Sequence, residues 1–136
     1  TETHSKFAAQ IGNEMPFYAA ATAKIIFAYQ PEMARTLFER NKPLVRFTTR
    51  TKTSLKSLLD DLQKSAAQGY AVCDEELENG VIALAAPVFN YEGRAIASIG
   101  VTGIKGNLKL ESTKDAICEC ARTISAELGF SPTSLR

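Results

Sequence analysis

Three short apolar runs lie close together in the second half of the chain, at residues 70–73, Val81–Phe89 and 95–101. Each has the length and composition of a β-strand, and polar links that contain glycine separate them. The link between the second and third runs is Asn-Tyr-Glu-Gly, in which Gly93 can adopt the positive φ that a tight turn needs. The chain is therefore expected to form a three-stranded meander that ends in a hairpin.

The third run has two different faces, because side chains alternate across a strand. One face is apolar and is expected to lie beneath a helix, whereas the other mixes glycine with hydroxyl groups. A floor of small side chains fits a pocket for a small polar molecule, although small residues also allow a helix to pack closely on a sheet. The apolar face holds Ala95, Ala97, Ile99 and Val101; the other holds Ile96, Ser98, Gly100 and Thr102, with Val81, Ala83 and Ala85 of the second run beside them.

Four helices are expected around these strands, at residues 19–29, 31–40, Leu55–Gln68 and 112–128, with a further strand at residues 4–9. The third helix follows a capping serine or threonine and stops at a glycine. Together these elements predict an α+β fold built on a small antiparallel sheet. The apolar stripe of the last helix, which should cover the apolar face of the third strand, consists of Ile117, Ala121, Ile124 and Leu128.

Composition limits the functions open to a chain of 136 residues, which is long enough for one domain. The formal net charge is +1 with both signs interspersed, so nothing indicates a nucleic-acid surface, and no apolar run could span a membrane. Cys118 and Cys120 would lie about 200° apart on a helix, so they cannot bridge each other, and a cytoplasmic location is expected. One histidine, His4, and no Cys-x-x-Cys motif leave no basis for a metal or another cofactor.

Charged and small residues suggest two kinds of polar site. The helix that begins in the small residues at 19–23 has free first amides, which favour a carboxylate or phosphate. Lys24 could add positive charge there, although a solvated lysine is the commoner case. Asp74, Glu75 and Glu76 could act as acid and base, but carboxylates between two strands usually form a solvated turn, and that interpretation is preferred.

Four segments of the sequence carry a resemblance to a known family. They read M-P-F-Y-A-A-A-T-A-K from Met15, G-Y-A-V-C-D-E-E from Gly69, A-L-A-A-P-V-F from Ala83 and A-S-I-G-V-T-G from Ala97. These segments resemble the effector-binding domain of the IclR family of bacterial transcription regulators, and the match runs from about residue 7 to about residue 129. The block from Gly69 to the Pro-Val-Phe sequence is the most specific part.

The resemblance implies a GAF-like antiparallel sheet with helices packed on one face and a ligand cleft on the other. In the family, this cleft binds a small metabolite, often an organic or aromatic acid, and the domain follows a winged helix-turn-helix that binds DNA. Residues 1–136 are therefore expected to be a single partial effector-binding domain without the DNA-binding domain. A homodimer or homotetramer is expected, with operator DNA bound only through the absent domain.

The family's ligand contacts can be carried over to eight positions of this sequence. Several of these positions depart from the family, because an acidic residue, cysteine and serine are common where Cys73, Ala83 and Gly100 stand. Each change removes a polar group, so the effector is expected to be more apolar or larger than a small oxoacid, or the site to have lost binding. The carried-over positions are Phe7 and Met15 as apolar wall, Ala21 and Thr22 as backbone donors, and Cys73, Ala83, Gly100 and Thr102 as further lining.

One alternative function belongs to a different class. Some GAF-fold proteins reduce methionine sulfoxide with cysteines near the pocket, and Cys73 lies on the candidate pocket. Such catalysis needs a second cysteine close by, whereas Cys118 and Cys120 are expected on the helix that covers the other face. A binding domain that is not an enzyme is therefore the preferred interpretation.

Overall fold

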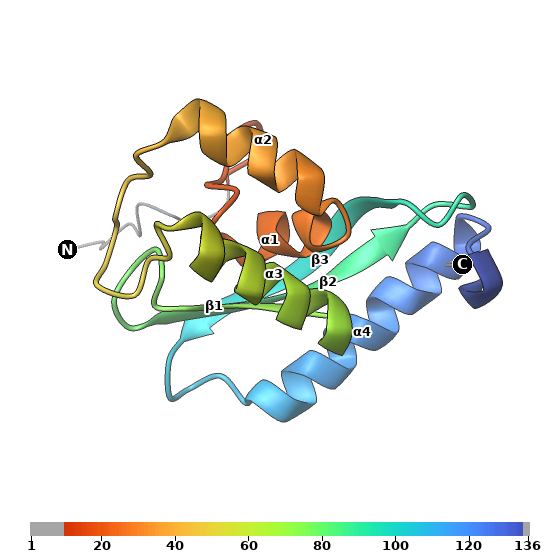
Figure 1. Cartoon of the computed structure of the whole chain (residues 1–136). Coiled ribbons are helices and arrows are strands. Elements are labelled where there is room, and N and C mark those ends of the chain that lie inside the picture. Colours follow the sequence, from red (N-terminus) through yellow and green to blue (C-terminus); the bar gives the residue numbers. More distant parts are fainter. Residues whose placement is uncertain (1–9, 135–136) are drawn as a thin grey trace.

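A three-stranded antiparallel sheet in the order β1-β2-β3 lies at the centre of the computed structural model, which describes residues 10–134 (Figure 1). The strands are β1 (Ala71–Asp74), β2 (Val81–Phe89) and β3 (Ala95–Ile104). The meander and hairpin are thus confirmed, and Gly93 has a φ of 78° in the turn between β2 and β3. The strand expected at residues 4–9 lies outside the described residues.

Helices cover both faces of this sheet. The first three, α1 (Ala21–Ala28), α2 (Pro31–Asn41) and α3 (Leu55–Gln68), lie on one side, with α2 packed on the outside of α1 and α3. The fourth, α4 (Leu110–Glu127), crosses the opposite face, and a single 3-10 turn follows at Pro132–Ser134. The α+β class is confirmed, but the layers differ from the expectation, because the face expected to hold an open cleft is covered by α1 and α3.

Local sequence signals explain where these helices begin and end. The Ser54 hydroxyl accepts a hydrogen bond from the Ser57 amide at the start of α3, and Gly69 ends that helix with a φ of 85°. In contrast, α1 begins two residues later than expected, because the amides of Ala19 and Ala20 bond to the carbonyl of Pro16 in a preceding turn. None of the helices at residues 10–134 is long and apolar enough to cross a membrane.

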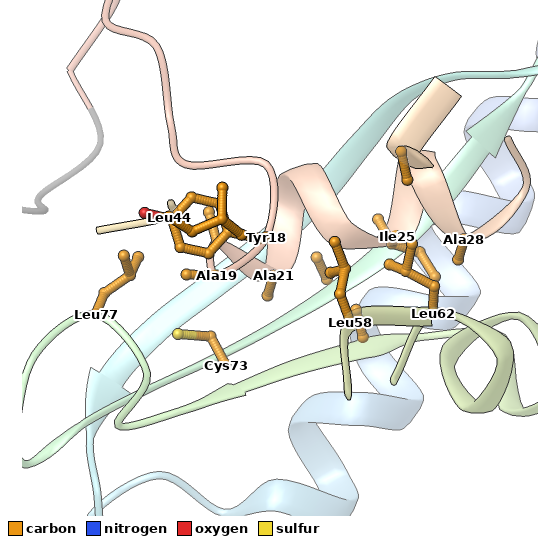
Figure 2. Close-up of a cluster of buried hydrophobic side chains, with 14 residues drawn as sticks. Tyr18, Ala19, Ala21, Ile25, Ala28, Leu44, Leu58, Leu62, Cys73 and Leu77 are labelled. Atoms are coloured by element: carbon orange, nitrogen blue, oxygen red, sulfur yellow. The ribbon is translucent and has the colours of Figure 1, made fainter. Parts of the chain in front are cut away.

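The main core lies between α1, α3 and the small-residue face of the sheet (Figure 2). Ile25 of α1 meets Leu58 and Leu62 of α3, and all three side chains are fully or almost fully buried. Cys73 points from β1 toward the start of α1. On the opposite face, Ile99 joins the cluster beneath α4, as its position in the strand predicts. The division of β3 into two faces is therefore confirmed for Ile99 and Val101, whereas Ala97 is exposed. Leu128, expected in the covering stripe of the last helix, lies just after the end of α4 and is 44% exposed.

Candidate small-molecule site

A small cavity lies beside the start of α1, between that helix, the sheet and the loop from β1 to β2. Its volume is about 60 Å³. We call it the α1-face cavity. Leu77 and Glu78 contribute the loop wall. Six of the eight predicted site residues line this cavity together: Met15, Ala21, Thr22, Cys73, Ala83 and Thr102.

The floor of the α1-face cavity is a row of small residues that crosses all three strands. Cys73 of β1 pairs with Ala83 of β2, which in turn pairs with Thr102 of β3. Directly opposite residues in adjacent strands project from the same face, so the three side chains form one row. The sheet register thus brings together predicted residues that are far apart in the sequence.

The roof of the cavity is the N-terminus of α1, where backbone donors are free. Ala20 precedes the helix with an extended backbone and provides no side-chain cap. The amides of Ala21 and Thr22 find no acceptor among residues 10–134. Free amides at a helix N-terminus attract carboxylates and phosphates, because they add to the positive end of the helix dipole.

The resemblance implies a ligand contact at Gly100, and the structure shows a packing role for this residue. It does not line the α1-face cavity. A Cβ atom there would lie 2.8 Å from Cγ2 of Thr22 and 3.1 Å from the carbonyl oxygen of Leu84. Gly100 therefore allows α1 to lie close to the sheet, where the Ser98 hydroxyl donates a 2.9 Å hydrogen bond to the Thr22 carbonyl. The other predicted contact outside the cavity lining, Phe7, lies outside the described residues.

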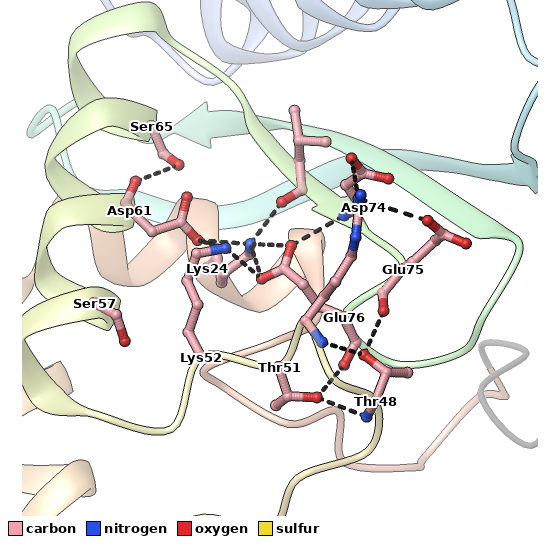
Figure 3. Close-up of polar contacts among 12 residues, drawn as sticks. Lys24, Thr48, Thr51, Lys52, Ser57, Asp61, Ser65, Asp74, Glu75 and Glu76 are labelled. Atoms are coloured by element: carbon pink, nitrogen blue, oxygen red, sulfur yellow. Dashed lines mark hydrogen bonds and ion pairs between the residues drawn. The ribbon is translucent and has the colours of Figure 1, made fainter.

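A buried cluster of charges connects the walls of this cavity (Figure 3). Lys24 is fully buried on α1, and its Nζ donates to Asp61 Oδ2 at 2.7 Å, to the Val72 carbonyl at 2.6 Å and to Glu76 Oε1 at 3.0 Å. Lys52 Nζ also donates to Glu76 Oε1 at 3.0 Å. Buried charges are tolerated only when they are paired in this way. The cluster therefore holds α1, α3, β1 and the β1–β2 loop together.

Sequence reasoning misses this cluster. It favours a solvated Lys24 and places Glu76 in a solvated turn, yet their exposed fractions are 0% and 2%. The available signal is position, because Lys24 is the single charged residue in an otherwise apolar or small α1. A charge at such a position needs partners when the helix is covered on both sides. Glu76 has no comparable signal, because its neighbours Asp74 and Glu75 are also acidic and remain partly exposed.

Asp74 and Glu75 do form the expected solvated turn. Lys105 Nζ lies 2.7 Å from Asp74 Oδ1 and 3.1 Å from Glu75 Oε2, and Arg50 lies 2.8 Å from Asp74 Oδ2. The hydrogen bond from Lys105 lowers the pKa of Asp74. For Glu75 the hydrogen bond from the Gly80 amide is the largest cause of a lowered pKa, and Lys105 adds to it.

Comparison with known proteins identifies the family. The family model described as "Bacterial transcriptional regulator IclR C-terminal" matches residues 1–126. The chain belongs to the IclR family. Its relatives include the DNA-binding transcriptional repressor YiaJ of Escherichia coli strain K12, which is 34% identical over 127 residues, covering 90% of this chain and 45% of the repressor. The chain spans about half the length of the curated relatives it matches.

Solved structures of IclR-family proteins share the fold. The C-terminal domain of the E. coli regulator KdgR superposes with a TM-score of 0.76 at 31% identity, covering 85% of this chain and 72% of that domain. The inducer-binding domain of PobR from Acinetobacter, solved as a double mutant with 3-hydroxybenzoic acid, gives a TM-score of 0.74 at 25% identity and covers 93% and 74% of the two chains. The resemblance to the C-terminal domain of this family is thus confirmed.

The cysteines of this IclR-family chain give no support to sulfoxide reduction. Cys73 is buried, and burial raises the pKa of its thiol, with a smaller contribution from the Glu76 carboxylate. A raised pKa keeps the less reactive thiol form. Cys118 and Cys120 lie on α4, on the opposite face of the sheet from Cys73. No second cysteine at residues 10–134 therefore stands beside Cys73.

Proposed function

We propose that this chain senses a small organic acid in the α1-face cavity and that binding alters how the full-length regulator binds DNA. Membership of the IclR family supports a role in transcription, since relatives such as YiaJ are DNA-binding repressors. The observation that carries the proposal is the meeting of two free amides, at Ala21 and Thr22, with six family-matched positions around one cavity. We assign residues 1–136 to one partial effector-binding domain. DNA would be bound by a winged helix-turn-helix domain outside these residues.

In the proposed complex, the carboxylate of the acid accepts hydrogen bonds from the amides of Ala21 and Thr22 and from the Thr102 hydroxyl. Each charge-assisted bond would contribute roughly 1.5–3 kcal/mol. The rest of the acid would lie between Met15 and Ala83. The volume of about 60 Å³ is small beside the ~300–1,000 Å³ of typical ligand pockets, so an acid of few atoms fits best, in contrast to the larger effector expected from the sequence. An aromatic acid such as the one held by PobR would require the Met15 or loop wall to move.

The proposal also includes the location, the absence of enzymatic activity and the oligomeric state of the protein. We assign it as a cytoplasmic binding domain and not as an enzyme, and as a homodimer or homotetramer. Support for assembly comes from β3, which has no strand partner on its outer side within residues 10–134 and exposes Ile96 and Ile104 at 54% and 59%. Sedimentation velocity tests this part, and a strict monomer at high micromolar concentration would contradict it.

A thermal-shift screen of small carboxylic acids tests the site itself. Acids that bind should raise the melting temperature of the chain, and Ala83→Leu, which fills the cavity from β2, should abolish the rise. Ala97→Leu is the matched control, since Ala97 is an exposed strand residue that does not line the cavity. The site assignment fails if no acid stabilises the parent at millimolar concentration, or if Ala83→Leu responds as the parent does.

A further inference from the structure

A second and larger cavity lies beyond the start of β1, between α4, the end of β2, the C-terminal turn and the ends of α1 and α3. We call it the α4-face cavity. Its volume is about 340 Å³, which is within the range of small-molecule pockets, whereas the α1-face cavity has about 60 Å³. Ala86 of β2 and Ala121 and Ala126 of α4 give it small, apolar walls. The two cavities share no lining residue.

Strand lengths explain why this space exists. β1 begins at Ala71, which pairs with Ala85, so β2 extends beyond the end of its neighbour. Backbone donors in that extension would normally need partners. Pro87 has no N–H, and the Phe89 amide donates to the Ser125 hydroxyl of α4 at 2.9 Å. The base of the cavity is therefore apolar, because neither Pro87 nor Phe89 leaves a buried N–H that would need a water molecule as its acceptor.

An aromatic group closes one end of the α4-face cavity. The Phe89 ring stacks on Phe130 with 4.9 Å between centroids and 25° between planes. It also meets the edge of Tyr29 at 5.0 Å and 81°. All three rings line the cavity. Flat apolar ligands pack well against rings in such arrangements.

One cation at the cavity has no partner within residues 10–134. Arg122 lines the cavity from the exposed side of α4, and it makes no hydrogen bond or ion pair with any of these residues. Arg122 stands near Cys118, another lining residue. Burial raises the pKa of the Cys118 thiol, and the charge of Arg122 partly offsets this rise. No Asp or Glu of the described chain lines the cavity. A guanidinium free to form two parallel hydrogen bonds matches a carboxylate.

We infer that the α4-face cavity is a second ligand site, which binds a carboxylic acid with a flat, aromatic body. The rings of the acid would lie against the stacked pair of Phe89 and Phe130, with Ala126 as a further wall, and the carboxylate would reach Arg122 at the mouth. This site is separate from the proposed effector site, because β2 presents Ala83 to one cavity and Ala86 to the other. Its ligand is also too large for the α1-face cavity.

A fluorescence titration with 2-naphthoate tests the inference. The chain has no tryptophan, so the naphthyl signal can be followed directly. We expect saturable binding to one site, and no saturation up to millimolar concentration would overturn the inference. Ala126→Phe should fill the cavity and abolish binding. Arg122→Gln should weaken binding about tenfold through loss of the charge-assisted contact, and Arg122→Lys should restore part of it.

Matched variants show whether binding depends on the α4-face cavity alone. Ala116→Phe, at an exposed position of α4 outside the cavity, and Arg40→Gln, on α2, should both bind 2-naphthoate as the parent does. The neutral amide, 2-naphthamide, should bind more weakly and be insensitive to Arg122→Gln. The inference is overturned if Ala126→Phe retains binding, or if Ala83→Leu in the α1-face cavity abolishes it instead. Urea denaturation of each variant confirms that loss of binding is not loss of fold.

Discussion

The face of the sheet beneath α1 and the face beneath α4 are stabilised by different kinds of contact. Beneath α1, small residues and a buried charge cluster centred on Lys24 hold the helix close to the strands. Beneath α4, aliphatic side chains such as Ile117 and Leu84 pack together, and Ser125 is the one buried polar residue on α4. Buried directional bonds to charged groups therefore reinforce apolar packing beneath α1, whereas apolar packing dominates beneath α4.

This difference accounts for the two cavities. Hydrogen bonds from Ser98 and Lys24 hold α1 at a set height and leave a narrow space at its free amides. α4 instead rests on side chains of unequal size, and small residues at Ala121 and Ala126 leave a wider apolar space. The first cavity is suited to the charge of a ligand and the second to its apolar body. Four predictions test how far the two faces differ.

The largest effect is expected at the buried cluster. Lys24→Met removes the positive charge that pairs with Asp61 and Glu76 and leaves both carboxylates near an apolar side chain. Breaking a buried pair in this way costs about 3–5 kcal/mol in the free energy of unfolding. Urea denaturation followed by circular dichroism measures the change. We expect a loss near the lower end of this range, because Lys52 also donates a hydrogen bond to Glu76 and would still partly balance its charge.

The control for this variant is Lys56→Met. Lys56 pairs with Asp60 one turn away on the exposed side of α3, and surface pairs of this type contribute little. Its unfolding midpoint should stay close to that of the parent. Equal midpoints for Lys24→Met and Lys56→Met would show that the buried cluster does not stabilise the α1 face.

The second effect concerns the close approach of α1 to β3. Gly100→Ala would place a methyl group 2.8 Å from Cγ2 of Thr22, so the Thr22 side chain or the helix must shift. Overpacking of this kind costs about 1–3 kcal/mol. Thr22→Ser removes that methyl, and the double variant should therefore recover part of the lost stability in urea denaturation. A double variant no more stable than Gly100→Ala would mean that another contact, such as the Leu84 carbonyl, causes the loss.

The third effect isolates the buried polar group of the α4 face. The Ser125 hydroxyl donates to the Ala121 carbonyl and accepts from the Phe89 amide, so Ser125→Ala leaves a buried donor without an acceptor. We expect a loss of about 1–2 kcal/mol. Ser65 on α3 is a matched control, because its hydroxyl is equally buried but only donates, to the Asp61 carbonyl. Ser65→Ala should cost less, and the opposite order would refute this role of Ser125.

Most of the fold could be predicted from local signals. The alternation in β3, the serine cap and glycine stop of α3, and Gly93 in the hairpin depend on residues adjacent in the sequence. Of the six predicted residues at the α1-face cavity, Cys73, Ala83 and Thr102 meet because strand register follows from the same alternation. The pairing of Lys24 with Glu76 could not be predicted, because it depends on how deeply α1 lies between α3 and the sheet.

The α4-face cavity escaped prediction for a similar reason. It arises because β1 is shorter than β2 and because the chain after α4 returns Phe130 to Phe89. Neither feature has a sequence pattern of its own. Small residues such as Ala121 and Ala126 indicate close helix packing as readily as a cavity. Gly100 is the opposite case. The sequence predicts that it lines a pocket, but in the structure it lies outside the α1-face cavity lining and allows α1 to pack closely on the sheet.

The smallest effect sharpens the contrast between buried and partly exposed charge on the α1 side. Asp74 and Glu75 have lowered pKa values in the folded chain, from 3.8 and 4.5, because hydrogen bonds from Lys105 and from the Gly80 amide favour their charged forms. A depressed carboxyl pKa contributes stability above its unfolded value, and this is lost as the pH falls through the folded value. Lys105→Met should therefore flatten the fall in unfolding free energy between about pH 5 and pH 3, measured by urea titrations. Lys64→Met removes an exposed lysine that makes no ion pair at residues 10–134 and should leave this slope unchanged. An identical slope in Lys105→Met and the parent would show that these pairs add nothing here, because solvent screens them fully.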